Sequence, residues 1–156
     1  HTGRARLVPA QLSPPAEVPD DEYPLILITG RQLEHWHTGA MTRRAGVLDS
    51  LEPSPTASAH PNTLARNDVA PGDLIKVTTR RGSIELTARA DMAVQEGTVF
   101  IPFAYVEAAA NILTNPQLDP YGKIPEFKFC AVRIGPADSK PQPVDDSDLN
   151  VTAAGL

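Results

Sequence analysis

The chain has 156 residues, of which 41% are hydrophobic, and this length and composition predict one compact domain with its own buried core. The formal net charge of -5 provides no basic surface for a phosphate backbone, so we expect no nucleic-acid partner. No apolar stretch approaches the roughly 20 residues that span a bilayer, and the N-terminus has no hydrophobic signal-peptide core, so we expect no membrane insertion.

The first residues of the chain predict an extended segment that leads into a domain. Residues 1–22 are rich in proline and acidic side chains without apolar periodicity, so we interpret them as an extended lead-in. The chain begins with His1 rather than Met, and we expect the natural protein to extend further. The domain itself is predicted over residues 23–135, and its first strand is the apolar run PLILIT at residues 24–29.

A polar region follows this strand. Residues 30–44 carry too many polar, aromatic and basic side chains for a core element, so we predict a loop with a helical turn near residues 41–47. Residues 52–59, EPSPTASA, are interpreted as a flexible connector. Asn62 is expected to cap a short helix that ends before Pro71.

The second half of the chain is dominated by short strands. Apolar and polar residues alternate in residues 73–79 and 83–89, which predicts an antiparallel hairpin. Another strand is expected at residues 97–103 and should end at Pro102, which has no N–H to donate. Residues 104–113 can form a short helix or a helical turn.

The last strand and the strand count complete the predicted architecture. The final strand is expected at residues 127–134, and residues 136–156 are interpreted as an acidic, proline-containing tail. Cys130, inside this predicted strand, is the only cysteine, so no internal disulfide can form, which fits a reducing compartment such as the cytoplasm. Five or six short strands without regular βαβ alternation favour a small mixed β-barrel over a doubly wound sheet.

Two histidines raise the possibility of a metal site. The spacing of His35 and His37 would place both imidazoles on one face of an extended segment, where they could share a zinc ion. A third ligand is missing, since His60 lies beyond the connector, so we favour hydrogen bonding and predict no metal site. There is also no Gly-x-Ser-x-Gly elbow, and we propose no catalytic residue.

A nucleotide would have to be held without the common glycine-rich loops. No P-loop or Gly-x-Gly-x-x-Gly motif is present, because Gly30 and Gly39 are too far apart. Arg31, however, directly follows the first strand and a glycine, and Arg43 and Arg44 are near it in sequence. With threonine hydroxyls close by, this cluster can bind a phosphorylated ligand, and ordinary surface arginines are the alternative interpretation.

Three blocks of the sequence together resemble a known family. TGRQLEHWHTGAMTRR, residues 29–44, looks like the loop after the first strand of the molybdopterin-dinucleotide-binding C-terminal domain of formate dehydrogenases and nitrate reductases. Residues 62–103 are similar to the middle of that domain, and residues 107–134 resemble its closing segment. The blocks occur in the family's order and together cover about residues 24–134.

The resemblance implies a mainly β fold, a six-stranded double-psi β-barrel, that closes over a bis(molybdopterin guanine dinucleotide) cofactor. Its Mo or W would be held elsewhere in the parent enzyme, so no metal ligand is expected here. In the first block the implied cofactor contacts are Thr29, Gly30, Arg31, His35, His37, Thr38, Met41 and Thr42. In the later blocks they are Phe103, Asn111, Phe127 and Lys128.

The resemblance also implies roles for these residues, and their side-chain chemistry agrees with those roles. His35, His37 and Thr38 would donate to phosphate or pterin groups, and Asn111 would bind the pterin or its linker. Phe127 and Lys128 would flank the cofactor. Asn111 as a helix C-cap and Phe127 as ordinary core remain alternative interpretations.

The resemblance further implies a parent enzyme that oxidises formate to CO2, assisted by upstream domains of the same chain and by electron-transfer subunits. In the family, the iron–sulfur cysteines and the catalytic residues lie in those upstream domains, so the 156 residues alone are expected to be inactive. Three alternatives remain open: the same domain of a nitrate reductase-type enzyme, a stand-alone interaction module of similar fold, and a small metal-dependent enzyme centred on His35 and His37.

Overall fold

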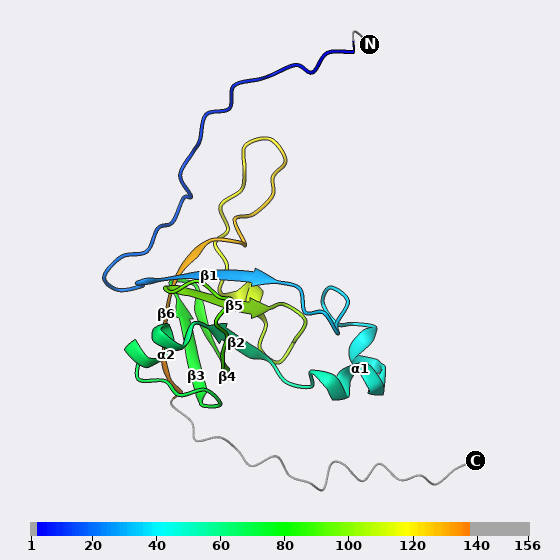
Figure 1. Ribbon diagram of the computed structural model, residues 1–156, viewed down its shortest axis with the longest axis vertical. Coiled ribbons are helices and arrows are strands. Elements are labelled where there is room, and N and C mark those ends of the chain that lie inside the picture. The colour runs from blue at the N-terminus through cyan, green and yellow to red at the C-terminus, as the bar shows by residue number, and fades with distance from the viewer. Residues whose placement is uncertain (1–2, 138–156) are drawn as a thin grey trace, which may run out of the picture.

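Six strands close into one barrel. The computed structural model of the chain describes residues 3–137. The strands are β1 (Leu25–Gly30), β2 (Thr56–Ala59), β3 (Leu74–Thr79), β4 (Gly82–Ala90), β5 (Thr98–Pro102) and β6 (Cys130–Pro136), and Figure 1 shows their arrangement. The helices are α1 (Gly46–Leu51) and α2 (Pro61–Arg66), with the 3-10 turns η1 (Thr42–Arg44) and η2 (Ala110–Ile112). The predicted six-stranded, mainly β barrel is therefore confirmed.

The order of strands around the barrel determines which loops meet. The order is β1-β5-β2-β4-β3-β6, with β1 parallel to β5 and β2 parallel to β4. In the first pair Thr29 lies beside Ile101 and Gly30 beside Pro102. Because parallel strands end at the same edge of a sheet, the segments that follow β1 and β5 leave the barrel side by side.

The core forms because alternate strand residues point inward. In β3, Ile75 and Val77 are fully buried, and in β4 Leu86 and Ala88 are nearly so. This period of two is the alternation that predicted the hairpin, which the structure confirms as an antiparallel pair. Proline at position 102 ends β5, as expected.

The connector predicted at residues 52–59 is wrong in its second half. Thr56, Ala57, Ser58 and Ala59 form β2, which is buried along its whole length between β4 and β5. Polar and apolar residues alternate in Thr-Ala-Ser-Ala, but all four side chains are small, so the run lacks the bulky apolar residues that usually mark a strand. The small side chains fit a crowded barrel interior, where larger side chains would overpack it.

The predicted cap of α2 is also wrong. Its N-cap is His60, whose Nδ1 accepts a hydrogen bond from Asn62 N at 3.1 Å. Pro61 occupies the first helical position, where its missing N–H costs nothing, so the capping residue is the one before it. The Asn62 side chain instead donates to Glu96 at 2.6 Å.

The remaining segments differ from their predictions mainly in extent. Residues 104–113 form only the turn η2, and the last strand begins at Cys130 rather than residue 127. The lead-in runs as extended chain beside the 116–127 loop (Figure 1), where Ala16 N donates to the Glu126 carboxylate. Of the predicted tail, residues 138–156 lie outside the described residues. Within residues 3–137 no helix has the length and apolar character to cross a bilayer.

Candidate functional site

The end of β1 is fastened to the turn before β6. The Thr29 side chain is fully buried, and its Oγ1 donates to the Phe127 carbonyl at 2.7 Å. In return, Lys128 Nζ donates to the Thr29 carbonyl at 2.8 Å. An ammonium group has three N–H donors, so Lys128 keeps donors for a further acceptor at this exposed position.

Gly30 joins this junction to the segment after β5. Its carbonyl accepts from Phe103 N at 3.1 Å. A Cβ on Gly30 would lie 2.3 Å from Cε2 of Phe100, so only glycine allows the backbone to pass so close to that ring. Phe103, partly buried against the core, therefore lies next to the Thr29–Lys128 junction.

Thr38, Phe103 and Asn111 line a cavity of about 180 Å³. They come from the loop after β1, the exit of β5 and the turn η2. Asn111 is exposed, and within residues 3–137 its side-chain amide has no hydrogen-bond partner. The C-cap of η2 is Leu113, so the alternative of Asn111 as a C-cap is wrong. The other lining residues are Tyr105, Val106, Ala109 and Ala110.

A second glycine, Gly39, allows the loop after β1 to pack closely against the segment that lines this cavity. Gly39 has φ +74, and its N–H donates to the Trp36 carbonyl at 2.9 Å. A Cβ at this position would lie 2.7 Å from the Ala104 carbonyl oxygen. The loop therefore lies directly against the segment that follows β5, which brings Thr38 to the cavity wall.

His35 anchors the base of the loop. It is 2% exposed, and its Nε2 donates to the Glu52 carbonyl at 2.8 Å, beside the Tyr105 hydroxyl, which donates to the same carbonyl at 2.9 Å. The two rings meet edge to face. His35 Nδ1 is buried and has no partner within residues 3–137, and in the neutral imidazole it is an acceptor.

His37 does not share a face with His35. The residue has φ 50 in a turn, and its exposed ring packs edge-on against Trp36 at 4.6 Å between centroids. The zinc hypothesis required an extended segment with the imidazoles of His35 and His37 on one face, and this prediction is wrong. In the described part of the chain, no group of at least three His, Cys, Asp or Glu side chains could hold a metal ion.

The far end of the loop is closed by Thr42. Its Oγ1 accepts from Trp36 N at 3.0 Å, which joins the two ends of the turn. Met41 is 68% exposed beside it. Thr42 therefore shapes the loop through this bond, whereas Met41 and His37 present their side chains to solvent.

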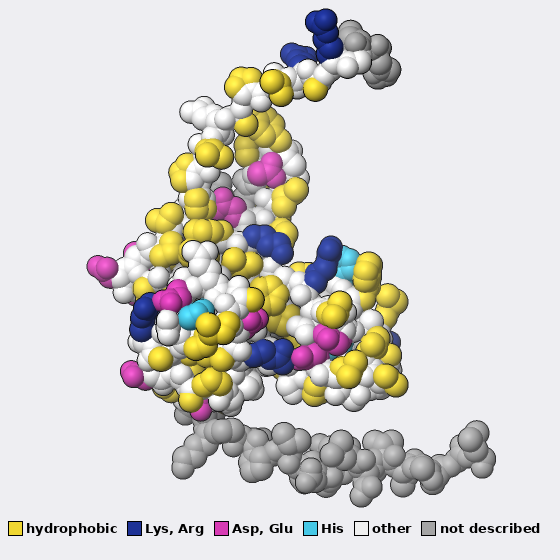
Figure 2. Space-filling model, viewed as in Figure 1, with side chains coloured by type: hydrophobic (Ala, Val, Ile, Leu, Met, Phe, Trp, Pro, Cys, Tyr) yellow, Lys and Arg dark blue, Asp and Glu magenta, His cyan; other side chains and the backbone are white. Residues whose placement is uncertain are grey.

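The arginines of the loop divide into engaged and free ones. Arg43 donates to Glu107 at 2.6 Å and to Asp49 at 3.1 Å, and its hydrogen bond to Glu107 raises the pKa of the Arg43 guanidinium. Within residues 3–137 the exposed side chains of Arg31 and Arg44 have no hydrogen bond or ion pair. Figure 2 shows Lys and Arg side chains on both sides of a hollow between the 116–127 loop and the region of α1.

The twelve predicted site residues thus fall into groups. The junction and the cavity bring together Thr29, Gly30, Thr38, Phe103, Asn111, Phe127 and Lys128. Arg31 follows the junction directly, His35 and Thr42 hold the loop, and His37 and Met41 are exposed. Phe127 is only half-buried and lies under the Lys128 ammonium at 5.4 Å, outside the core cluster.

Sequence reasoning missed Tyr105, Val106 and Ala109. These residues follow the strand that ends at Pro102, and they reach the cavity because β5 runs parallel to β1. The pairing of two strands so distant in sequence left no local pattern by which the three residues could be found. The nearness of Tyr105 to the predicted Phe103 was the one available signal.

Comparison with known proteins gives the family. The family described as "Molydopterin dinucleotide binding domain" matches residues 25–131. The chain belongs to this family. The predicted family and the predicted cofactor, a molybdopterin guanine dinucleotide, are thereby confirmed. The donors at the site fit this cofactor. The remaining N–H donors of Lys128 and the guanidinium of Arg31 suit its phosphates, and the side-chain amide of Asn111 suits the polar edge of a guanine or pterin ring.

The relatives of this dinucleotide-binding domain are much longer proteins. It is 45% identical over 132 residues to "F420-dependent formate dehydrogenase subunit alpha" of Methanocaldococcus jannaschii, covering 85% of this chain and 20% of that protein. It is 42% identical over 120 residues to "F420-dependent formate dehydrogenase 1 subunit alpha" of Methanococcus maripaludis, covering 77% and 18%. The chain therefore spans about a fifth of the length of these relatives.

A solved structure is similar in fold. The acetylene hydratase from Pelobacter acetylenicus matches with a TM-score of 0.68 and 25% sequence identity. The match covers 74% of this chain and 19% of that one. A domain of similar fold therefore also makes up about a fifth of that enzyme.

Proposed function

We propose that the domain binds the guanine dinucleotide part of a bis(molybdopterin guanine dinucleotide) cofactor at the edge where β1 and β5 end. The observation that supports this site is the convergence of three distant stretches, in which Lys128 bonds Thr29 and Phe103 bonds Gly30. Phe103 also lines the cavity that Asn111 faces. A large ligand can therefore contact all three stretches at once.

Each residue has a role that its surroundings allow. Lys128 and Arg31 offer positive charge to phosphate oxygens, and neither carries an acidic partner within residues 3–137. Asn111 and Thr38 can donate and accept at a ring or a ribose. Gly30 has no side chain at the junction, so a ligand can lie directly against its backbone. When bound, the cofactor supplies the metal-centred redox chemistry, while these residues hold its dinucleotide end.

For the parent protein we propose an Mo- or W-dependent formate dehydrogenase that oxidises formate to CO2. The names of the two relatives, both formate dehydrogenase alpha subunits, support this substrate. The other four-fifths of such a protein would supply the upstream domains, which complete the cofactor site, and electron-transfer subunits would be its partners. The one cysteine of the 156-residue chain, Cys130, is a free thiol, and this supports a cytoplasmic location.

A second candidate differs in substrate alone. The likeness to acetylene hydratase supports a parent that contains this domain and acts on a substrate other than formate. Formate oxidation by the whole parent protein separates the two candidates, since turnover of formate with an electron acceptor is expected only of the first.

Titration of the 15N-labelled 156-residue chain with GDP tests the dinucleotide site itself. We expect amide shifts in residues 29–42, at Asn111 and at Lys128. The substitution Lys128→Ala should weaken GDP binding about tenfold, because it removes a charged hydrogen-bond donor. Lys123→Ala is the matched control, since among the described residues the Lys123 ammonium donates only to the Pro120 carbonyl at the loop tip. Equal loss in both variants, or no shift at Asn111, would remove the proposed site.

A further inference from the structure

The turn between β3 and β4 is hydrogen-bonded to the C-terminal end of η2. The guanidinium of Arg81 donates from Nε and Nη2 to the Leu113 carbonyl, at 3.2 and 2.9 Å. Leu113 is the C-cap of η2 and is itself fully buried. A planar guanidinium that donates twice to one carbonyl allows little rotation of that peptide. The end of η2 is thus fixed by both the core and Arg81.

Gly82 brings the same turn into direct contact with η2. A Cβ at Gly82 would lie 2.8 Å from Cγ2 of Ile112, so the turn and η2 are packed as closely as glycine permits. Ala110 on the other side of η2 is 1% exposed. Asn111 lies between these two held residues and is the exposed one that lines the cavity.

The N-terminal lead-in fixes Arg81 in turn. One oxygen of the Glu17 carboxylate accepts from Arg81 Nη1 at 2.5 Å, and the other accepts from Arg80 Nη1 at 2.6 Å. The Glu17 side chain is only 12% exposed, so solvent screens this pair less than an open surface pair. With Nη1 directed to Glu17, the opposite edge of the Arg81 guanidinium faces Leu113.

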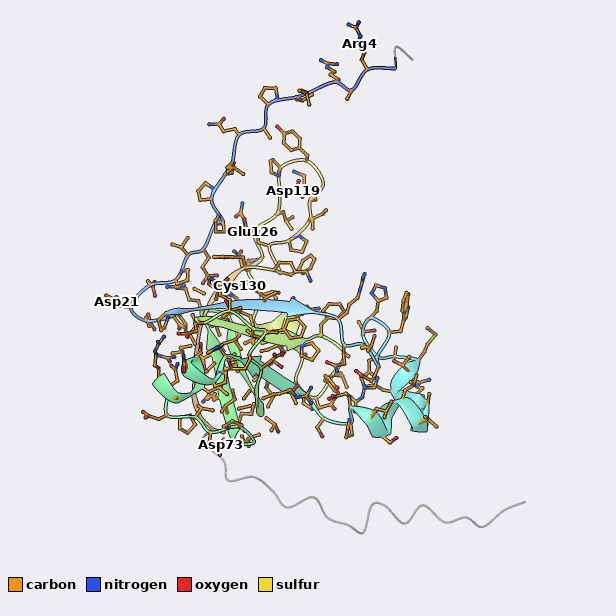
Figure 3. The ribbon with its side chains drawn as sticks, in the orientation of Figure 1. Arg4, Asp21, Asp73, Asp119, Glu126 and Cys130 are labelled. Atoms are coloured by element: carbon orange, nitrogen blue, oxygen red, sulfur yellow. The ribbon has the colours of Figure 1, made fainter. Side chains whose placement is uncertain are left out.

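A second contact holds the lead-in in place. Glu126 accepts from Ala16 N at 3.0 Å and from Asn115 Nδ2 at 3.0 Å, close to Glu17 and to the segment that follows η2. Figure 3 shows Glu126 between the lead-in and the barrel, with Cys130 nearer to β1. The lead-in is therefore connected at two points to the segment that carries Asn111.

We propose that Arg81 is a positioning residue for Asn111. It fixes η2 so that the Asn111 amide faces the cavity, and Glu17 of the lead-in holds Arg81 in the orientation that this requires. The consequence for ligand binding rests on the proposed function, whereas the positioning of η2 does not. The chain that precedes the domain is thereby coupled to the dinucleotide site.

Arg81→Lys tests the positioning, with Arg80→Lys as its matched control. Both arginines bind Glu17, and both variants keep the positive charge, but only Arg81 touches Leu113. In the ligand-free chain, R81K should shift the side-chain amide of Asn111 and increase its fast motion in 15N relaxation. R80K should leave both unchanged. Equal Asn111 spectra in R81K and the wild type would overturn the proposal.

A double-mutant cycle with GDP separates positioning from a general loss of structure. In the wild-type background R81K should weaken GDP binding about fivefold, as expected for one misplaced hydrogen-bond partner. In the Asn111→Ala background it should have no further effect, because the group that it positions is gone. An equal loss in both backgrounds would contradict positioning through Asn111.

Two further outcomes remain decisive. If R81K does not fold, Glu17→Gln is the test, since this variant keeps Arg81 and removes the carboxylate that binds it. The Asn111 signals should then shift as they would in R81K. Unchanged Asn111 signals in E17Q would contradict the proposal. If the wild-type chain binds no GDP, the dinucleotide site proposed above fails, while the ligand-free Asn111 spectra still decide the positioning.

Discussion

At the scale of single residues, close approach of backbone to an aromatic ring shapes the site. Gly30 lies beneath Phe100, and the space that a Cβ would need is taken by the ring. Its carbonyl also holds Phe103, which lines the cavity. A change at Gly30 therefore affects both the barrel edge and the cavity wall.

Gly30→Ala should destabilise the chain by roughly 1–3 kcal/mol, because the added methyl group overpacks the contact with Phe100. The measurement is urea unfolding followed by circular dichroism. Gly135→Ala is the matched control in β6, since a Cβ there meets no atom within 4 Å, and it should change stability little. Equal effects of the two substitutions would show that the ring contact is unimportant.

Tyr105 makes the stability of the chain sensitive to alkaline pH. Burial raises its pKa from 10.0 to about 12, so the folded chain holds the phenolic proton where the unfolded chain has lost it. Its stabilising contribution is therefore complete below pH 10 and is lost as pH rises from 10 to about 12.

Tyr105→Phe tests this pH dependence. At pH 7 the variant should be less stable by about 1 kcal/mol, because the hydrogen bond to the Glu52 carbonyl is lost. The wild type's advantage should shrink in urea unfolding as pH rises above 10, since phenylalanine has no proton to lose. A difference that stays constant up to pH 11.5 would contradict the role of Tyr105.

At the scale of elements, Arg43 connects the α1 region to the rest of the barrel. Its guanidinium bonds Asp49 within α1, Glu107 in the segment after β5, and the Pro53 carbonyl. It also lies 4.9 Å above the Tyr105 ring. None of the residues of α1 is buried, so this side chain is a main attachment of the helix.

Arg43→Gln should therefore loosen α1 locally. We expect faster hydrogen exchange in residues 42–51 and a global loss of about 1 kcal/mol or less, because the ion pairs are partly exposed. Arg44→Gln, a neighbouring arginine whose side chain has no partner within residues 3–137, is the matched control. Unchanged exchange in R43Q would mean that α1 is held by other contacts.

The elements also show which parts of the fold a sequence pattern can reveal. The hairpin of β3 and β4 was predictable because one face of each strand is buried, so that apolar and polar residues alternate along both strands. Residues 56–59 give a weaker signal, because their alternation of Thr, Ala, Ser and Ala contains no bulky apolar side chain, although all four residues are buried. The cap of α2 was misplaced because Pro61 occupies the first helical position and moves the cap to His60.

At the scale of the whole molecule, the candidate site depends on pairings that no local pattern encodes. The strand before Arg31 and its terminal glycine were apparent in the sequence, but their position beside Phe103 follows from the parallel pairing of β1 with β5. The bonds between Thr29 and the turn at Phe127 and Lys128 likewise join residues 98 and 99 positions apart. That these stretches share one site was predicted from the family resemblance and not from the periodicity of the sequence.

Those two bonds have a consequence for the order of events in the cell. Lys128 lies just before the final strand of the barrel, and its contact with Thr29 forms slowly because a long loop must close first. A chain still emerging from the ribosome has the glycine edge but not yet the ammonium group opposite it. The proposed site is therefore complete only after the chain has been synthesised past Lys128 and this residue has packed against Thr29.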